Sequence, residues 1–187
     1  MQIDRDEIVR LTGEYGGQWG LNHVRRLLNL IAIIGEDQEY DKDAVWTATH
    51  LHDWGAYAHW KRDGVHHAAR SVEVIAPFLA ERGCPEAFNS LVLECIELHH
   101  EYTAPKRIEA VLLSDADGLD FLGAVGVLRD ISKHPRDLRK GRAASQQRRD
   151  TIPNQLVLPR SKEIARLRVQ QMDALYEQFE ENTFGCF

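Results

Sequence analysis

The sequence lacks the long apolar segments that a membrane protein needs. Mean hydropathy is -0.41 over the 187 residues, and the longest apolar run, Leu27–Ile34, is short and interrupted by Asn29. No stretch approaches the roughly 20 apolar residues of a membrane-spanning helix. The first residues are acidic and do not resemble a secretory signal. We therefore expect a cytoplasmic protein that does not bind a membrane.

Cysteine is scarce, and basic residues are not in excess. The 3 cysteines, Cys84, Cys95 and Cys186, are odd in number and do not have the spacing of a zinc knuckle, so we expect free thiols. The 23 Lys and Arg against 29 Asp and Glu give a net charge of -6. This charge argues against a broad basic face that binds extended nucleic acid.

Strict alternation of apolar and polar residues, which is typical of half-buried strands, is also absent. Apolar residues instead recur at helical spacing, so the sequence predicts an all-α fold, a compact helical bundle. We find no repeat and no change of composition, and expect a single domain over residues 1–187. Pro77 predicts a kink or a break in the third helix, and Ser161 is the expected N-cap of the last. The expected helices cover residues 24–34, 43–52, 66–82, 85–98, 108–113, 119–131 and 161–181.

Residues 134–160 differ from the rest of the chain. They contain three prolines and a cluster of basic residues that includes Arg136, Arg139, Lys140, Arg142, Arg148 and Arg149. We interpret the segment as one long basic loop ahead of a C-terminal helix. Loops of this length in compact domains are usually functional or disordered. The segment is either a solvated loop or a lid that closes over an anionic substrate.

Histidine is the residue type that the sequence has in excess. Eight of the 9 histidines lie between His23 and His100, mostly at predicted helix ends, where side chains from several helices can converge. Imidazole and carboxylate are the usual ligands of transition metals. Five histidines and two aspartates are candidate ligands, which are too many for one tetrahedral zinc and suit two octahedral ions. The carboxylate of Asp53 could bridge two metals about 3.5–4 Å apart. The candidate ligands are His23, His52, Asp53, His67, His99, His100 and Asp117.

The order of these residues resembles the HD superfamily of metal-dependent phosphohydrolases. The local contexts are similar as well: His23-Val-Arg-Arg-Leu, Thr49-His-Leu-His-Asp53 and His67-Ala-Ala-Arg-Ser71. Residues 113–127, which include Asp117, resemble the stretch with the final aspartate of bacterial predicted HD hydrolases. The resemblance covers about residues 20–130. It depends on the full ordered series, because a His-Asp dipeptide alone is uninformative.

The resemblance implies a first metal held by His23, His52, Asp53 and Asp117. A second metal would share Asp53 and bind His67, His99 and His100, whereas the simplest members hold one ion with the first four residues. Two positions have a close competitor, His66 for His67 and Asp115 for Asp117. The spacing to Ser71 favours His67, and the preceding alanine favours Asp117. The nitrogen-rich ligands favour Mn or Fe over Mg.

The resemblance further implies a phosphohydrolase that cleaves a phosphoester or phosphoanhydride bond in a nucleotide or another small phosphorylated substrate. A metal-bound water would be the nucleophile, and Asp53 and His52 are the expected catalytic residues. Positive charge near the phosphate would come from three candidate substrate-binding residues. These are Lys61, Arg70 and Arg142.

Three features depart from the pattern of the family. Phosphodiesterase branches usually follow His-Asp with Gly-Lys, but Trp54 and Gly55 occupy these positions here. No Gly-Tyr-Pro follows Glu101, and Gly118 stands where related hydrolases usually have a larger, often basic residue. Each departure weakens a cyclic-dinucleotide function and leaves a broader phosphohydrolase intact. The aromatic residues Trp54, Tyr57 and Trp60 could line a substrate pocket or belong to the core.

Two other functions are open at this point. The same ligands could hold a mixed-valent di-iron centre in an oxygenase, or metal could bind to a catalytically silent regulatory module. The expected partner is a small phosphorylated substrate, such as a nucleotide, and the sequence also allows a homo-oligomer.

Overall fold

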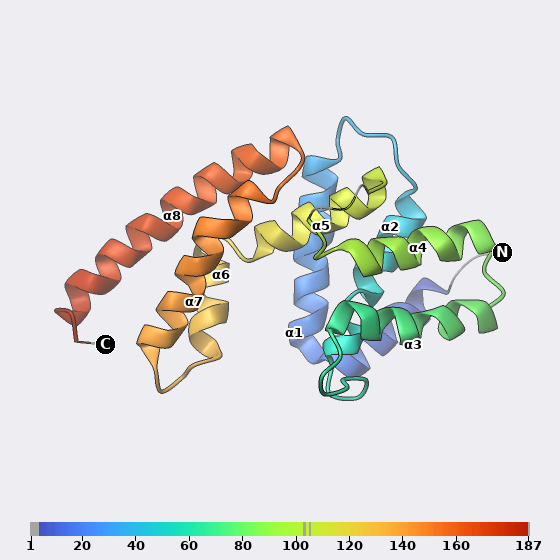
Figure 1. Cartoon of the computed structure of the whole chain (residues 1–187), viewed down its shortest axis with the longest axis horizontal. Coiled ribbons are helices and arrows are strands. Elements are labelled where there is room, and N and C mark those ends of the chain that lie inside the picture. The colour runs from blue at the N-terminus through green and yellow to red at the C-terminus, as the bar shows by residue number, and fades with distance from the viewer. Residues whose placement is uncertain (1–3, 103, 105, 187) are drawn as a thin grey trace. The chain divides into compact units, whose positions relative to one another are not determined.

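The computed structural model describes residues 4–102, 104 and 106–186, and every regular element within them is helical (Figure 1). The all-α prediction is therefore confirmed. The first three residues of the acidic N-terminal segment lie outside the described residues. No helix of the described part is long and apolar enough to cross a membrane. The elements are α1 (Arg5–Ile34), α2 (Lys42–Leu51), η1 (Trp54–Ala56), α3 (His67–Glu81), α4 (Glu86–Leu98), α5 (Ile108–Asp120), α6 (Gly123–Ser132), α7 (Leu138–Thr151), η2 (Ile152–Asn154) and α8 (Pro159–Thr183).

The chain divides into two compact units, Met1–Ser114 and Asp115–Phe187, and the boundary falls inside α5. The single-domain organisation stays a prediction. In the first unit α1 packs on α2, α2 packs on α4, and α3 lies beside α4 (Figure 1). The core of this unit includes Ile8, Leu27, Leu51, Ile75, Leu79 and Ile96.

Helix α1 begins much earlier than predicted, so His23 lies in its interior and does not open it. The helix has a break at Gly17, whose φ of 60° and ψ of -166° are accessible to glycine and strained for other residues. The side chain of Tyr57 packs into a notch beside this break. A Cβ at Gly16 or Gly20 would lie 2.5 Å and 2.7 Å from the nearest Tyr57 atom. The glycines thus allow η1 to approach α1 closely.

Two details of the predicted helices in the first unit also differ. Helix α2 begins one residue before the predicted start and is capped by Asp41, whose carboxylate accepts from the backbone N–H groups of Asp43 and Ala44. Helix α3 runs on through Pro77, so the predicted interruption does not divide it.

In the second unit α6 packs against both α7 and α8, around Leu119, Leu122 and Met172. The predicted long basic loop is wrong, since residues 138–151 form α7. The basic side chains find acidic partners on neighbouring helices: Arg148 pairs with Asp130 at 2.9 Å and Arg149 with Asp173 at 2.8 Å. These ion pairs join α7 to α6 and α8, so the basic residues that suggested a loop belong to a packed helix.

The start of α8 differs from the prediction as well. Leu158 is the N-cap, and Ser161 lies buried inside the helix. The backbone N–H groups of Val157 and Leu158 bond instead to the carboxylate of Asp115, at 3.0 Å and 2.9 Å. Asp115 thus holds the segment just before α8, and the N-cap residue Leu158 makes no side-chain hydrogen bond to the first turn of the helix.

Candidate metal centre

The turn that ends α2 presents His52 and Asp53. His52 closes the helix, and its Nδ1 donates to the carbonyl oxygen of Thr49 at 2.9 Å. This bond places the ring proton on Nδ1 and leaves Nε2 with a lone pair available for a metal. His52 is only 1% exposed, and within the described residues its Nε2 is buried without a hydrogen bond.

Ser71 connects this turn to α3. Its hydroxyl donates to the carbonyl oxygen of His52 at 2.6 Å and accepts from the N–H of Gly55 at 2.8 Å. Gly55 touches the same helix so closely that a Cβ there would lie 2.4 Å from the carbonyl oxygen of His67. The small residues at 55 and 71 thus let the first turn of α3 bring His67 next to Asp53.

The first group of candidate ligands consists of His23, His52 and Asp53, whose ligand atoms all lie within 4.8 Å of one another. His23 is contributed by the buried face of α1. Its Nε2 lies 3.7 Å from Oδ2 of Asp53, and Nε2 of His52 lies 3.5 Å from the same oxygen. One carboxylate oxygen thus faces two imidazole nitrogens.

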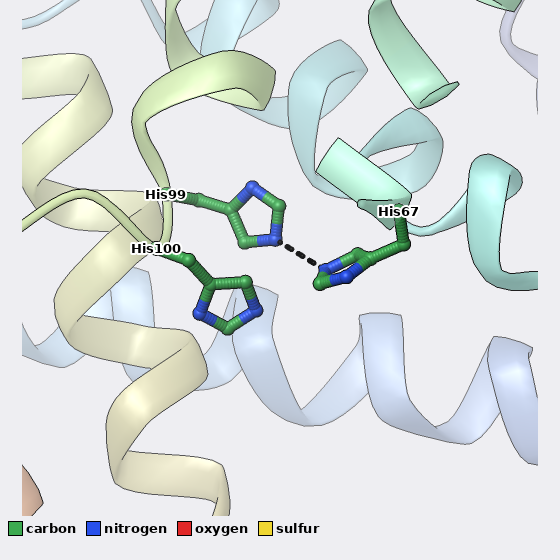
Figure 2. A group of neighbouring side chains, drawn as sticks. All are labelled: His67, His99 and His100. Carbon is green, nitrogen blue, oxygen red and sulfur yellow. Dashed lines mark hydrogen bonds between the residues drawn. The ribbon is translucent and has the colours of Figure 1, made fainter. Parts of the chain in front are cut away.

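The second group consists of His67, His99 and His100 (Figure 2). His67 is the first residue of α3, and His99 and His100 follow the last residue of α4. The Nε2 atoms of His67 and His99 face each other at 3.2 Å (Figure 2). Because Nδ1 of His99 donates to the carbonyl oxygen of Ile96 at 2.6 Å, its Nε2 is an acceptor or a ligand atom.

His66, the competitor of His67, has a different position. Its Nδ1 accepts from the backbone N–H of Ala68 at 3.4 Å, so His66 caps α3. The structure groups His67, and not His66, with the two histidines after α4.

Asp53 lies between the two groups. Its Oδ2 faces His23 and His52, whereas its Oδ1 lies 3.7 Å from Nε2 of His67. Burial lowers the pKa of His67 to about 4, although the nearby Asp53 carboxylate opposes this shift. The imidazole is therefore neutral at pH 7, which is the form that binds metals.

These residues fit one or two divalent transition metals. The ligand atoms of each group are close enough to bind one ion, and each group is rich in imidazole. The buried Nε2 of His52 supports this fit independently, since a buried polar atom without a hydrogen bond needs an explanation such as a bound ion.

Asp117 and its competitor Asp115 are both buried in α5. Asp115 is engaged in the hydrogen bonds that precede α8, which is a structural role. The role of Asp117 as a ligand of the first metal stays a prediction.

The three candidate substrate-binding residues have different surroundings. Lys61 is exposed in the loop between η1 and α3. Arg70 already bonds to the carbonyl oxygen of Trp60 at 2.7 Å and to Glu73 at 2.8 Å. Arg142, on α7, bonds to Glu180 and lies over the ring of Tyr176. Their contact with a phosphate stays a prediction.

A polar contact beside the second group was not predictable from the sequence. The Tyr102 hydroxyl lies 3.4 Å from Nδ1 of His100, and Nζ of Lys106 lies 5.4 Å from the centre of the Tyr102 ring. Lys106 also donates to the hydroxyl of Ser114 at 2.9 Å. A single lysine in an irregular segment gave no periodic signal by which this contact could have been found.

The fold of the chain is shared with several solved structures. Solved structures similar to the chain include a predicted HD superfamily hydrolase from an uncultured Thermotogales bacterium, with 21% identity and a TM-score of 0.69, covering 95% of this chain and 92% of that one. Bacillus subtilis YpgQ in complex with ADP has 22% identity and a TM-score of 0.73, covering 95% and 93%. An HD-superfamily hydrolase from Bacillus thuringiensis has 18% identity and a TM-score of 0.73, covering 97% of each chain.

At these identities the similarity establishes a shared fold. No curated protein matches the sequence. The model of the HD domain family, however, matches residues 20–122, which is more than half of the chain and includes every candidate metal ligand. The chain belongs to the HD domain family.

Proposed function

We propose that the protein is a metal-dependent phosphohydrolase that acts on a nucleotide. The observation that carries this proposal is the position of Asp53, which directs one carboxylate oxygen toward His23 and His52 and the other toward His67. A carboxylate placed in this way suits a bridge between two metal ions.

His23, His52, Asp53 and Asp117 would hold the first ion, and His67, His99 and His100 would hold the second with Asp53. A divalent ion bound there lowers the pKa of water toward neutrality and polarises a phosphoryl oxygen. The number of imidazoles favours Mn or Fe over Mg.

The chain's own residues would position the reactants. Asp53 would orient the attacking water, while the hydrogen bond from His52 to Thr49 keeps the imidazole in one orientation and one tautomer. Lys61 lies on the loop that leads from Asp53 to His67, so its flexible side chain could reach a phosphate from there. Arg70 and Arg142 already bond to other protein groups, so each guanidinium would have to bind the phosphate in addition to these partners.

A nucleotide is favoured as the substrate by two observations. YpgQ of Bacillus subtilis, which has a similar fold, was solved in complex with ADP. The net charge of -6 disfavours an extended nucleic acid and leaves small anionic substrates, which bind through a local site.

The test is a comparison of Asp53→Ala and Asp53→Asn with Asp63→Ala, a control at an exposed aspartate of the neighbouring loop. Metal content is measured by elemental analysis, and phosphate release is measured with a panel of nucleotides in the presence of Mn²⁺. We expect both Asp53 variants to lose metal and at least 100-fold in activity, as removal of a key transition-state contact typically does. Full metal content and turnover in Asp53→Ala would overturn the proposal.

A further inference from the structure

The four tryptophans of the chain differ in how much of their surface is exposed. Trp54 is 1% exposed and belongs to the core, and Trp46 is partly covered by the ring of His50 and the guanidinium of Arg5. Trp60 is partly buried in a cluster of aromatic rings. Trp19, in contrast, is 51% exposed.

Trp19 also has a specific neighbour. It lies four residues before His23 on α1, so that the two side chains share one helix face. The centres of their rings are 5.8 Å apart, and the ring planes are inclined by only 30°. The exposed indole is thus adjacent to a residue of the first ligand group.

The local backbone fixes this position. Trp19 lies in the first turn after the break at Gly17, and the next residue, Gly20, is in close contact with the Tyr57 hydroxyl. Tyr57 is 7% exposed and belongs to the same segment that follows Asp53. The segment of α1 around Trp19 is therefore packed against the turn that carries the catalytic aspartate.

We infer that Trp19 is the surface on which the base of the nucleotide stacks while its phosphates reach the first ligand group. This inference rests on the proposed function and adds the residue that recognises the base. Stacking uses the π-face that every base has, so it depends little on which base the nucleotide carries. The site should accordingly bind nucleotides with different bases, and purines, with their larger rings, more tightly than pyrimidines.

The test measures binding instead of turnover. Dissociation constants for ADP and for inorganic pyrophosphate, which has no base, are measured by calorimetry with wild type, Trp19→Ala and Trp19→Phe. Ile33→Ala is the matched control, because Ile33 is another exposed apolar residue of α1, at 45% exposure. We expect Trp19→Ala to raise the Kd for ADP roughly 5- to 150-fold, which corresponds to the loss of one stacked base. Pyrophosphate binding should change less than ADP binding, and Trp19→Phe should keep most of the affinity.

Tryptophan fluorescence gives a second readout. ADP should quench the emission of wild type and of Trp46→Phe, and the quenching should largely disappear in Trp19→Phe. This readout does not require Trp19→Ala to fold. The inference is overturned if wild type does not bind ADP, if Trp19→Ala binds ADP as wild type does, or if ADP and pyrophosphate lose affinity equally. Binding of ADP through Trp19 without any phosphate release would leave this inference standing and refute the proposed hydrolysis.

Discussion

The hydroxyl of Ser71 donates a hydrogen bond of 2.6 Å to the carbonyl oxygen of His52. The same oxygen atom of Ser71 accepts from the N–H of Gly55, so a single buried side chain holds both sides of the turn that contains Asp53. The turn after α2, with His52 and Asp53, is joined in this way to α3, which carries His67.

Replacing Ser71 by alanine should therefore affect both stability and metal binding. The substitution leaves the carbonyl of His52 and the N–H of Gly55 buried without their partner, which should cost about 1–3 kcal/mol in the free energy of unfolding. Chemical denaturation measures this cost, and a titration with Mn²⁺ should show weaker binding. Ser90→Ala, at an exposed position of α4, is the control. Equal stability and equal metal affinity in Ser71→Ala and wild type would refute the role assigned to Ser71.

The two neighbouring histidines at the start of α3 should differ in their effect on metal content. We expect His67→Ala to reduce the metal bound per chain from two ions to one, because the second group loses one of its three imidazoles. His66→Asn should keep both ions, since asparagine can cap the helix in place of the present Nδ1. Elemental analysis of the purified variants after incubation with Mn²⁺ decides between these results. An equal metal content in His67→Ala and wild type would exclude the second group as a binding site.

Much of the fold was predictable because apolar spacing is a local property. The helices that contain Leu27 and Leu91 were recognised by their apolar stripe, and both residues are buried. Helix α7 was not recognised, because its stability depends on partners such as Asp130 and Asp173, which are remote in the sequence. A polar helix that is held by long-range ion pairs looks like a loop when only its own residues are considered.

The candidate site, like the fold, was predictable from the sequence only in part. The order of the His-Asp series was sufficient to identify the family and to select the two groups. The sequence did not reveal that Ser71 holds the turn or that Trp19 is exposed beside His23. Each of these depends on how separate helices pack, and helix packing leaves no signal at a fixed spacing.

The ion pair between Glu7 and Arg82 should make stability depend on pH. Two hydrogen bonds, of 2.9 Å and 2.7 Å, join the guanidinium to the carboxylate, and they lower the pKa of Glu7. A carboxyl whose pKa is lower in the folded state contributes stability above its unfolded pKa of about 4.3, and this contribution is lost as the pH falls through the folded value.

The expected result is a wild type that is more stable than Glu7→Gln at pH 7, with a difference that shrinks under acidic conditions. Denaturation curves at several pH values between 7 and 3 measure it, with Glu39→Gln in an exposed loop as the control for the loss of one carboxylate. A difference that stays constant over this range would show that the Glu7 contribution does not come from its charge.

Gly118 should tolerate alanine but not arginine, and the reason lies in the packing of the second unit. A Cβ at this position would lie 3.3 Å from methyl carbons of both Ile152 and Leu156, which are flexible enough to move by a few tenths of an ångström. In Gly118→Ala this crowding opposes the better helix propensity of alanine, so stability should change by less than about 1 kcal/mol. Gly118→Arg must displace both side chains, which should cost about 1–3 kcal/mol.

Chemical denaturation tests this prediction. The arginine at position 118 should cost less stability in the Leu156→Ala background than in wild type, because alanine at position 156 opens the required space. If Gly118→Arg is as stable as wild type, Ile152 and Leu156 do not fill this space. The result also bears on function. The resemblance to HD hydrolases leads us to expect a larger, often basic residue at this position. We propose that exposed Lys61 supplies positive charge to a phosphate in its place, and Lys61→Ala is the variant that tests this role.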